Sequence, residues 1–343
     1  MFSVTNERGF VPQSEQFEGR DMVGDDIKAY KIIQSQEFAY NPARINVGSI
    51  AMYSGKAPCM ISSLYVCFKT TQKVDDEWLM QLLKTAKLNY CYNVNGEGGV
   101  RVYLFYPNFA RIRVSLPSLT EQKKIACFLN LLDERISTQN KIIEDLKKLK
   151  CAIIEKLYSE IQGKEYLYGQ LFEVVNKRNK QMEYSNILSA SQEKGMVNRD
   201  DLNLDIQFER SNINTYKIVR AGDYVIHLRS FQGGFAFSDK LGVCSPAYTI
   251  LRPNCLLEYG YLSYYFTSHR FIKSLIIVTY GIRDGRSINI EEWLNMKVII
   301  PSKEYQLHTL KILRSIEGKI ENEETYTICL SNQKQYLLNQ MFI

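Results

Sequence analysis

The feature that most constrains the fold of this chain is an internal duplication. Ser3–Val11 (SVTNERGFV) matches Ser189–Val197 (SASQEKGMV), and YKII further along the first copy matches YKIV in the second without a gap. Near the end of each copy the offset is two residues smaller, and RVSLPS ending at Ser118 matches KVIIPS ending at Ser302. Because repeated sequence builds repeated structure, we predict two similar units rather than one fold of 343 residues.

Each copy is predicted to be a mixed globular part followed by a long helix. Short runs such as YKIV, DYVIH, FAFS and AYTILRP are rich in β-branched and aromatic residues and are bounded by Gly, Asn or Pro, which is typical of strands. The stretches DEWLMQLLKTAKLNYCY and YGYLSYYFTSHRFIKSLI have the spacing of amphipathic helices. The expected fold class is therefore α+β, with two mixed α/β domains.

Two long helices are predicted, one from about Glu121 to Tyr158 and one from about Glu304 to the end, and both have apolar residues in a 4-3 rhythm. Polar interruptions such as Lys150 and Lys334 are typical of a partner-specifying coiled coil, so we expect two long antiparallel coiled-coil helices with pseudo-two-fold duplication. The alternative is that each apolar stripe packs only on its own domain. The predicted helix-pairing positions are Ile125, Leu129, Leu132, Ile136, Ile143, Leu146, Leu313, Ile316, Ile320, Leu330 and Leu337.

Composition argues against an enzyme. The chain has eight cysteines without a CxxC pair and only three histidines, so neither a metal site nor any other cofactor is expected. No G-x-x-x-x-G-K-[ST] loop, carboxylate pair or Ser/His/Asp set stands out. The net charge of +6 permits a polyanionic partner without requiring one. No signal peptide or membrane span is recognisable, so we expect a cytoplasmic protein with reduced thiols and no membrane partner.

The helix starts resemble a known family. LPSLTEQKKIACFLNLLDERISTQNKIIEDLKKLKCAIIEKLY is similar to the central conserved region of the specificity subunit of type I restriction-modification enzymes. IPSKEYQLHTLKILRSIEGKI, with YLLNQMF near the end of the chain, resembles the distal conserved region. Together with the YKIV-x-x-GDYV and SPAYTIL patterns, this resemblance covers nearly the whole chain.

The resemblance implies a non-catalytic DNA-recognition subunit. It implies target-recognition domains at residues 1–118 and 161–302, each of which reads half of a bipartite sequence in double-stranded DNA. It further implies spacer helices at 119–160 and 303–343 on which two methyltransferase subunits dock. Restriction or translocase subunits are further candidate partners, and methylation and cleavage belong to the partner chains.

Candidate DNA-contacting residues are chosen by their chemistry. Arginine is suited to bidentate contact with guanine or phosphate, and Gly-flanked loops such as GIRDGRS leave such side chains free to project. Other basic residues flank the bend SFQGG or occupy corresponding places in the first copy. Each is alternatively an ordinary solvated charge. The candidates are Arg44, Lys56, Arg101, His227, Arg229, Lys240, Arg283 and Arg286.

One departure from the family pattern concerns the first recognition domain. Met1 aligns with Ile187, so residues 164–186, which open the second recognition domain, have no counterpart in the first. Either the first domain is a shortened version or the chain begins inside it, and an incomplete sheet edge would leave the first half-site in doubt. Two other functions therefore stay open: a coiled-coil scaffold that does not touch DNA, and a truncated or phase-variable specificity subunit.

Overall fold

The computed structural model describes residues 1–16, 29–98, 102–191, 194–201, 210–227, 234–280 and 287–342. The chain divides into two compact units. The first unit comprises Met1–Lys141 and Glu324–Ile343, and the second comprises Ile142–Glu323. Two long helices, α5 (Leu119–Ser159) and α10 (Lys303–Met341), each contribute one portion to each unit. Among the described helices, none is both long and apolar enough to cross a bilayer.

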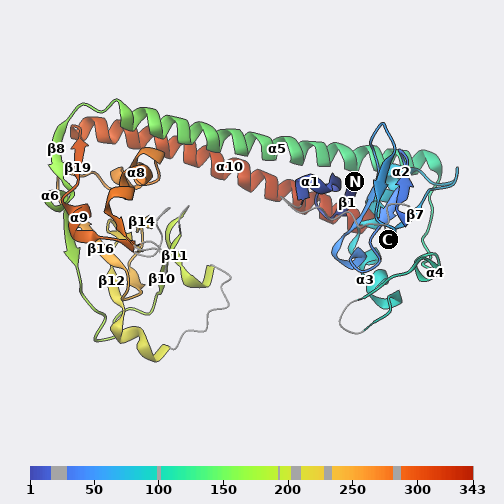
Figure 1. Cartoon of the computed structure of the whole chain (residues 1–343), viewed down its shortest axis with the longest axis horizontal. Coiled ribbons are helices and arrows are strands. Elements are labelled where there is room, and N and C mark those ends of the chain that lie inside the picture. The colour runs from blue at the N-terminus through green and yellow to red at the C-terminus, as the bar shows by residue number, and fades with distance from the viewer. Residues whose placement is uncertain are drawn as a thin grey trace. The chain divides into compact units, whose positions relative to one another are not determined.

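The first unit contains two small sheets and several short helices (Figure 1). One sheet has the order β2-β1-β6-β3 and the other has the order β5-β4-β7. The strands are β1 (Phe2–Thr5), β2 (Gly9–Pro12), β3 (Lys31–Ile33), β4 (Phe38–Tyr40), β5 (Ile50–Met52), β6 (Cys59–Ile61) and β7 (Val66–Phe68). The short helices are α1 (Gln13–Gln16), η2 (Ile45–Val47), α2 (Asp76–Leu83), α3 (Ala86–Asn95) and α4 (Tyr106–Phe109).

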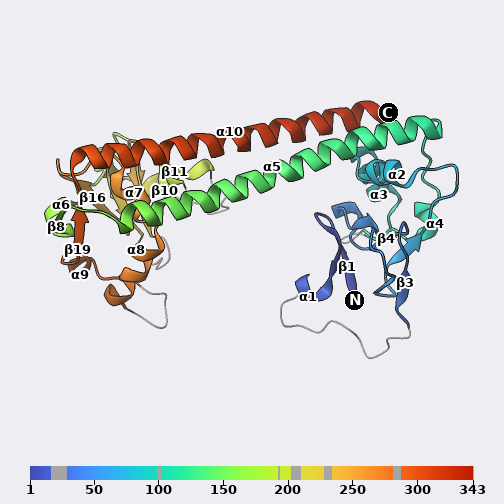
Figure 2. The same cartoon turned by 90° about the horizontal axis from the view of Figure 1, so that it is seen from above.

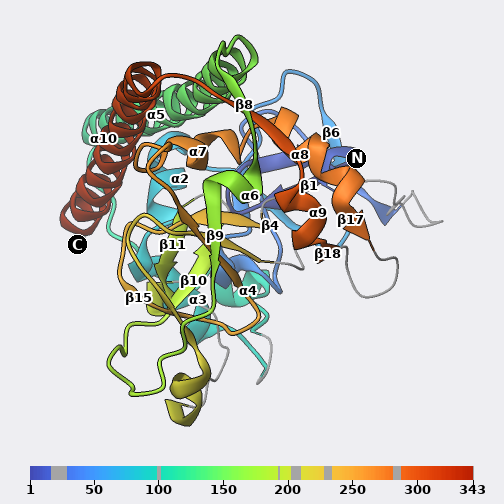
Figure 3. The same cartoon turned by 90° about the vertical axis from the view of Figure 1, so that its left-hand side faces the viewer.

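The second unit has a central sheet of order β14-β13-β16-β9, with the two-stranded sheets β10-β11, β12-β15, β17-β18 and β19-β8 (Figure 3). Its strands are β8 (Lys164–Leu167), β9 (Phe172–Val175), β10 (Leu188–Ser191), β11 (Gly195–Asn198), β12 (Lys217–Val219), β13 (Tyr224–Ile226), β14 (Phe235–Phe237), β15 (Gly242–Cys244), β16 (Thr249–Pro253), β17 (Thr279–Tyr280), β18 (Ser287–Ile288) and β19 (Lys297–Ile300). Its short helices are α6 (Tyr168–Leu171), η3 (Arg199–Asp201), η4 (Arg210–Thr215), α7 (Tyr261–Tyr265), α8 (His269–Ser274), η5 (Leu275–Val278) and α9 (Ile290–Leu294).

The duplication predicted from the sequence is present as equal strand pairing in equal register. Phe38 of β4 lies opposite Phe68 of β7 in the first unit, and Tyr224 of β13 lies opposite Leu251 of β16 in the second. The antiparallel pairs β1-β2 and β3-β6 recur as β10-β11 and β12-β15. The runs KIV, YVI, FAF and TILRP all form strands, as their β-branched and aromatic composition predicts.

Each stretch predicted as one amphipathic helix is interrupted at an equivalent residue. The first breaks into α2 and α3 at Thr85, whose hydroxyl accepts a hydrogen bond from the Leu88 backbone N–H at 3.3 Å. The second breaks into α7 and α8 at Ser268, whose hydroxyl accepts from the Phe271 N–H at 3.2 Å. A buried side-chain cap of this kind ends one helix and begins the next, so hydrophobic periodicity alone does not reveal the break.

Large aromatic side chains fill the cores of both units. Trp78 and Tyr92 are almost fully buried in the first unit. In the second unit the rings of Tyr168 and Trp293 stack with their centroids 4.3 Å apart. Burying side chains of this size contributes about 1.5–3 kcal/mol each relative to exposure, so these residues hold each small unit together.

Candidate functional site

Two buried glutamines fasten the long helices to the globular parts. Gln122, one turn into α5, is 1% exposed. Its side-chain Nε2 donates to the carbonyl of Pro117 at 2.9 Å and to that of Lys73 at 3.2 Å, and its Oε1 accepts from the N–H of Asp75 at 2.8 Å. Asp75 is in turn the N-cap of α2, so one amide joins the starts of two helices.

Gln306 makes the equivalent contacts at the start of α10. It is also 1% exposed. Its Nε2 donates to the carbonyls of Leu256 at 3.0 Å and Pro301 at 3.1 Å, and its Oε1 accepts from the N–H of Glu258 at 2.8 Å. Pro117 and Gln122, like Pro301 and Gln306, stand five residues apart in the sequence. This Pro-x-x-x-x-Gln spacing has a physical role, because each glutamine bonds two backbone carbonyls and one backbone N–H where its helix leaves the globular part.

Within each unit the two helix portions run side by side and antiparallel (Figure 2). In the first unit Lys334 Nζ lies 2.5 and 2.7 Å from the two carboxylate oxygens of Asp133, and Gln81 Nε2 donates to the same carboxylate at 2.9 Å. Arg135 lies over the ring of Tyr326, 5.6 Å from its centroid. The Asp133–Lys334 and Arg135–Tyr326 contacts each join an early residue of α5 to a late residue of α10, which is the predicted antiparallel arrangement.

The second unit has an equivalent ion pair, in which the lysine is on α5 and the acidic residue is on α10. Lys150 Nζ of α5 lies 2.6 Å from a carboxylate oxygen of Glu317 on α10. The Tyr264 hydroxyl, from the globular part, donates to the other oxygen of Glu317. Burial, followed by the neighbouring Glu317 carboxylate, raises the pKa of Tyr264, so its hydroxyl keeps the donated proton. Lys150 and Lys334 are thus the cations of matching ion pairs.

The apolar positions predicted to pair all face inward. Leu129, Ile143, Leu313, Ile320 and Leu330 are buried, and the other six are half-buried: Ile125, Leu132, Ile136, Leu146, Ile316 and Leu337.

Some of these positions also pack on the globular part, as the alternative interpretation predicted. Ile125, Leu129, Leu132 and Leu337 belong to the same hydrophobic cluster as Trp78. The pattern missed Ala126 and Leu338, which are buried one residue away from the predicted positions Ile125 and Leu337. It also missed Ile154 on α5 and Phe342 beside the end of α10, which are buried as well.

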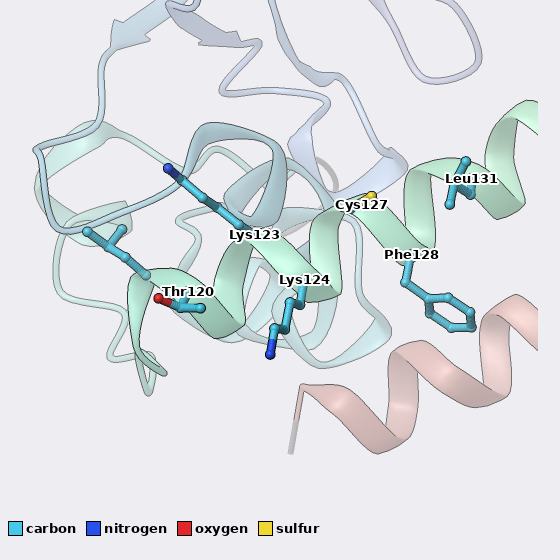
Figure 4. A pocket seen from close by; sticks show the side chains of 7 residues that line it. Thr120, Lys123, Lys124, Cys127, Phe128 and Leu131 are labelled. Carbon is cyan, nitrogen blue, oxygen red and sulfur yellow. The ribbon is translucent and has the colours of Figure 1, made fainter.

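An apolar surface on the first turns of α5 was not predicted from the sequence (Figure 4). We call it the α5 patch, and it is lined by Leu119, Thr120, Lys123, Lys124, Cys127, Phe128 and Leu131. Phe128 is 42% exposed and Leu131 is 58% exposed. Both residues lie outside the 4-3 rhythm of the helix, so they take no part in the predicted helix pairing. An apolar residue at such a position is the sequence feature that could have indicated this exposed surface.

The four described basic candidates follow equivalent strands of the two units. Arg44, directly before η2, and Lys56, after β5, are both exposed and flank β5. His227 follows β13 and donates its N–H to the carbonyl of Gly234 at 2.6 Å, just before β14, whereas Lys240 follows β14. Because β14 is the counterpart of β5, Lys56 and Lys240 occupy matching loops.

His227 and Lys240 are both half-buried, whereas Arg44 and Lys56 are exposed. The ring of His227 lies edge-on to Tyr248 with the centroids 5.1 Å apart. Its Nδ1 is buried and has no hydrogen-bond partner among the described residues. Four further candidates, Arg101, Arg229, Arg283 and Arg286, lie outside the described residues.

Comparison with known proteins gives consistent matches. The type I restriction modification DNA specificity domain matches residues 26–148. A putative type I restriction enzyme MjaX specificity subunit of Methanocaldococcus jannaschii is 22% identical over 93% of this chain and 80% of its own length. The MjaVIII specificity subunit of the same organism is 25% identical over 86% of this chain and 75% of its own length.

Solved structures share the fold at low sequence identity. A chain from a study of complex assembly and conformational transition in a type I restriction-modification system has a TM-score of 0.60, with 15% identity over 91% of this chain and 83% of that chain. The type I restriction-modification S subunit from M. genitalium has a TM-score of 0.51, with 13% identity over 91% of this chain and 84% of that chain.

Proposed function

This chain is a specificity subunit of the type I restriction-modification family, and on that premise we propose that each of its units reads one half of a bipartite DNA site while α5 and α10 dock methyltransferase subunits. The chain itself is non-catalytic. Methylation and cleavage belong to its partners. We propose that the chain acts in the cytoplasm, where it would meet DNA and the partner subunits.

The proposed division follows the duplicated sequence. The first target-recognition domain is assigned to residues 1–118 and the second to 161–302, with spacer helices at 119–160 and 303–343. The single observation that carries the proposal is the equal register of the two units, including matching Gln122 and Gln306 contacts. Two equivalent globular parts supply two equivalent reading surfaces, as a bipartite site requires.

We propose that DNA meets the ends of β5 and β14. Arg44 and Lys56 supply exposed positive charge in the first unit, and Lys240 occupies the matching loop in the second. A protein that neutralises phosphates with such side chains gains affinity by releasing counterions. His227 and the four arginines outside the described residues remain proposed contacts on the strength of their chemistry.

We propose that methyltransferase subunits dock on the outer faces of the long helices, with two copies because the helix pairing is duplicated. The α5 patch supports one docking position, since Phe128 and Leu131 expose apolar surface beside Lys123 and Lys124. Apolar anchors with a basic rim are typical of protein interfaces.

The proposal is tested by reconstituting the chain with its methyltransferase and measuring DNA binding against a library randomised in both half-sites. We expect enrichment of a bipartite motif, and adenine methylation at that motif should disappear from cells that lack this gene. If no sequence is enriched, the chain is a scaffold rather than a sequence reader. If only one half-site is enriched, and changes in the second unit abolish that enrichment, the first unit does not read DNA sequence.

Docking is tested separately. Leu131→Asp places a charge in the α5 patch and should lower co-purification of the methyltransferase by at least about tenfold. Leu64→Asp is the matched control, because Leu64 is 76% exposed on the globular part of the same unit. Equal co-purification by both variants would place the docking surface elsewhere.

A further inference from the structure

The two units differ at one edge. In the second unit the residues Lys164–Val175, here called the closing segment, form β8, α6 and β9 in succession (Figure 3). β8 pairs with β19 and β9 pairs with β16. Three side chains of the closing segment, Tyr168, Leu171 and Phe172, are at most 6% exposed and belong to the core of the unit.

The strands that receive the closing segment have counterparts in the first unit. Residues 113–116 (RVSL) match β19 (KVII). The two apolar residues that β19 buries, Val298 at 6% and Ile300 at 5% exposure, correspond to Val114 and Leu116, which are 42% and 48% exposed. In the described part of the chain, residues 113–116 belong to no strand.

β7 is the counterpart of β16. Tyr65 directly precedes β7, and Tyr248 directly precedes β16. Their carbonyls accept hydrogen bonds from matching lysines, Lys31 at 2.5 Å and Lys217 at 2.7 Å. Among the described strands, β7 pairs only with β4 and ends its sheet, whereas β16 pairs with both β13 and β9. The first unit therefore presents an open edge, which we define as residues 66–69 and 113–116. Unpaired strand edges with exposed apolar side chains are templates for strand addition.

The charges of the open edge match those of a closing segment. In the second unit Glu165 forms an ion pair with Lys297 at 2.7 Å. Glu173 lies opposite Arg252 in the strand register, and Arg252 also forms an ion pair with Asp223 at 2.9 Å. The first unit has Arg113 at the position of Lys297 and Lys69 at the position of Arg252. Both side chains are exposed. A segment with two acidic residues at the same spacing would find two cations on the open edge.

We propose that the open edge of the first unit is a docking site for a segment of another polypeptide that has the chemistry of the closing segment. This segment forms a strand, one helical turn and a second strand. Its anchors are an aromatic residue, a leucine and a second aromatic residue, at the spacing of Tyr168, Leu171 and Phe172, with acidic residues before and after them. Backbone hydrogen bonds to β7 and residues 113–116 supply affinity, and the three anchors supply specificity. This interaction does not depend on DNA.

The test uses the full chain and a fluorescent synthetic peptide with the sequence of residues 163–176. Anisotropy titration should show saturable binding, and hydrogen exchange should slow at residues 66–69 and 113–116. Leu116→Asp and Val114→Asp should each weaken binding at least about tenfold, since each removes an apolar contact at the edge. Both residues are exposed, so neither variant should prevent folding.

Two controls make the result specific. Leu64→Asp, on the surface of the same unit, should leave peptide affinity unchanged, and a peptide with serine in place of Tyr168, Leu171 and Phe172 should not bind. No saturable binding at millimolar peptide would overturn the proposal, as would slowed exchange only in the second unit. Self-association that Leu116→Asp abolishes, without peptide binding, would place a second copy on the edge and also overturn it.

Discussion

The ammonium of Lys334 on α10 contacts both carboxylate oxygens of Asp133 on α5, at 2.5 and 2.7 Å. The Lys334 side chain is 19% exposed and that of Asp133 is 44% exposed, so this ion pair is only partly screened by water. It joins the two long helices within the first unit. Its counterpart in the second unit, Lys150 with Glu317, shows that the duplication extends to the polar contacts of the helix pair.

We expect Lys334→Ala to lower the free energy of unfolding of the first unit by about 1–2 kcal/mol, because Asp133 then keeps its charge without its cation. Denaturation is followed by Trp78 fluorescence in a Trp293→Phe background, which leaves a single tryptophan in the first unit. Asp133→Ala combined with Lys334→Ala should cost less than the sum of the two single changes.

Arg8→Ala is the control for this pair, because Arg8 lies in the same unit. Its guanidinium is 3.9 Å from the Glu15 carboxylate, and both side chains are well exposed. Its loss should cost less than about 0.5 kcal/mol. Strict additivity of Asp133→Ala and Lys334→Ala would mean that the contact does not couple the helices.

Gln122→Ala should be more costly, by about 2–3 kcal/mol, because it leaves an N–H and two carbonyls without partners in a buried place. Gln122→Glu should cost at least as much, since a carboxylate cannot donate to Pro117 and Lys73. The same Trp78 fluorescence measures both variants, with the exposed Gln335→Ala as a control within about 0.5 kcal/mol of the parent. A well-tolerated Gln122→Glu would show that the two donated hydrogen bonds contribute little.

Lys56→Ala and Lys240→Ala test the matching loops of the two units. If each lysine contacts a phosphate, each change should make the slope of log affinity against log salt shallower by about 0.9, with no change in the preferred sequence. Binding is measured in the assembled complex at several salt concentrations, with Lys148→Ala as a control on the helices. An unchanged slope for both variants would place these loops away from the DNA backbone.

Arg283→Ala and Arg286→Ala are expected to act differently. If either arginine is bidentate to a guanine, its loss should cost about 1–3 kcal/mol and relax the preference at a single position of one half-site. Selection from a library randomised in both half-sites resolves this effect from a uniform loss of affinity. Unchanged selection by both variants would leave GIRDGRS as solvated surface.

Thiol labelling should distinguish a buried cysteine from one on the α5 patch. Burial raises the pKa of the Cys244 thiol to about 12, although Lys217 acts in the opposite direction. At pH 8 only about one thiol in 10⁴ is then ionised, and the thiolate is the reactive form. We expect mass spectrometry after brief alkylation to find exposed Cys127 modified and Cys244 unmodified until the chain is unfolded. Below its pKa the thiolate fraction of Cys244 rises tenfold per pH unit, so its labelling should speed up as the pH is raised. Rapid labelling already at pH 8 would contradict its burial.

Sequence alone was sufficient for the features that depend on local or repeated patterns. The duplication, the strands at YKIV and AYTILRP, and the two long helices after Pro117 and Pro301 follow from composition, periodicity and spacing. The spacing of Pro117 with Gln122 and of Pro301 with Gln306 is likewise visible in the sequence at both helix starts. These patterns are readable because the residues involved act on their own backbone or repeat in the other copy.

Tertiary structure decided what depends on residues far apart in the chain. Lys150 and Glu317 are 167 positions apart, so the seam pattern marked Lys150 as a polar interruption without showing that it pairs with Glu317. Val114 and Val298 occupy equivalent sequence positions, yet one is exposed and the other is buried. The difference arises because, among the described residues, a strand lies beside that position only in the second unit, where it is β8. Burial depends on the neighbours that a residue meets rather than on the residue itself.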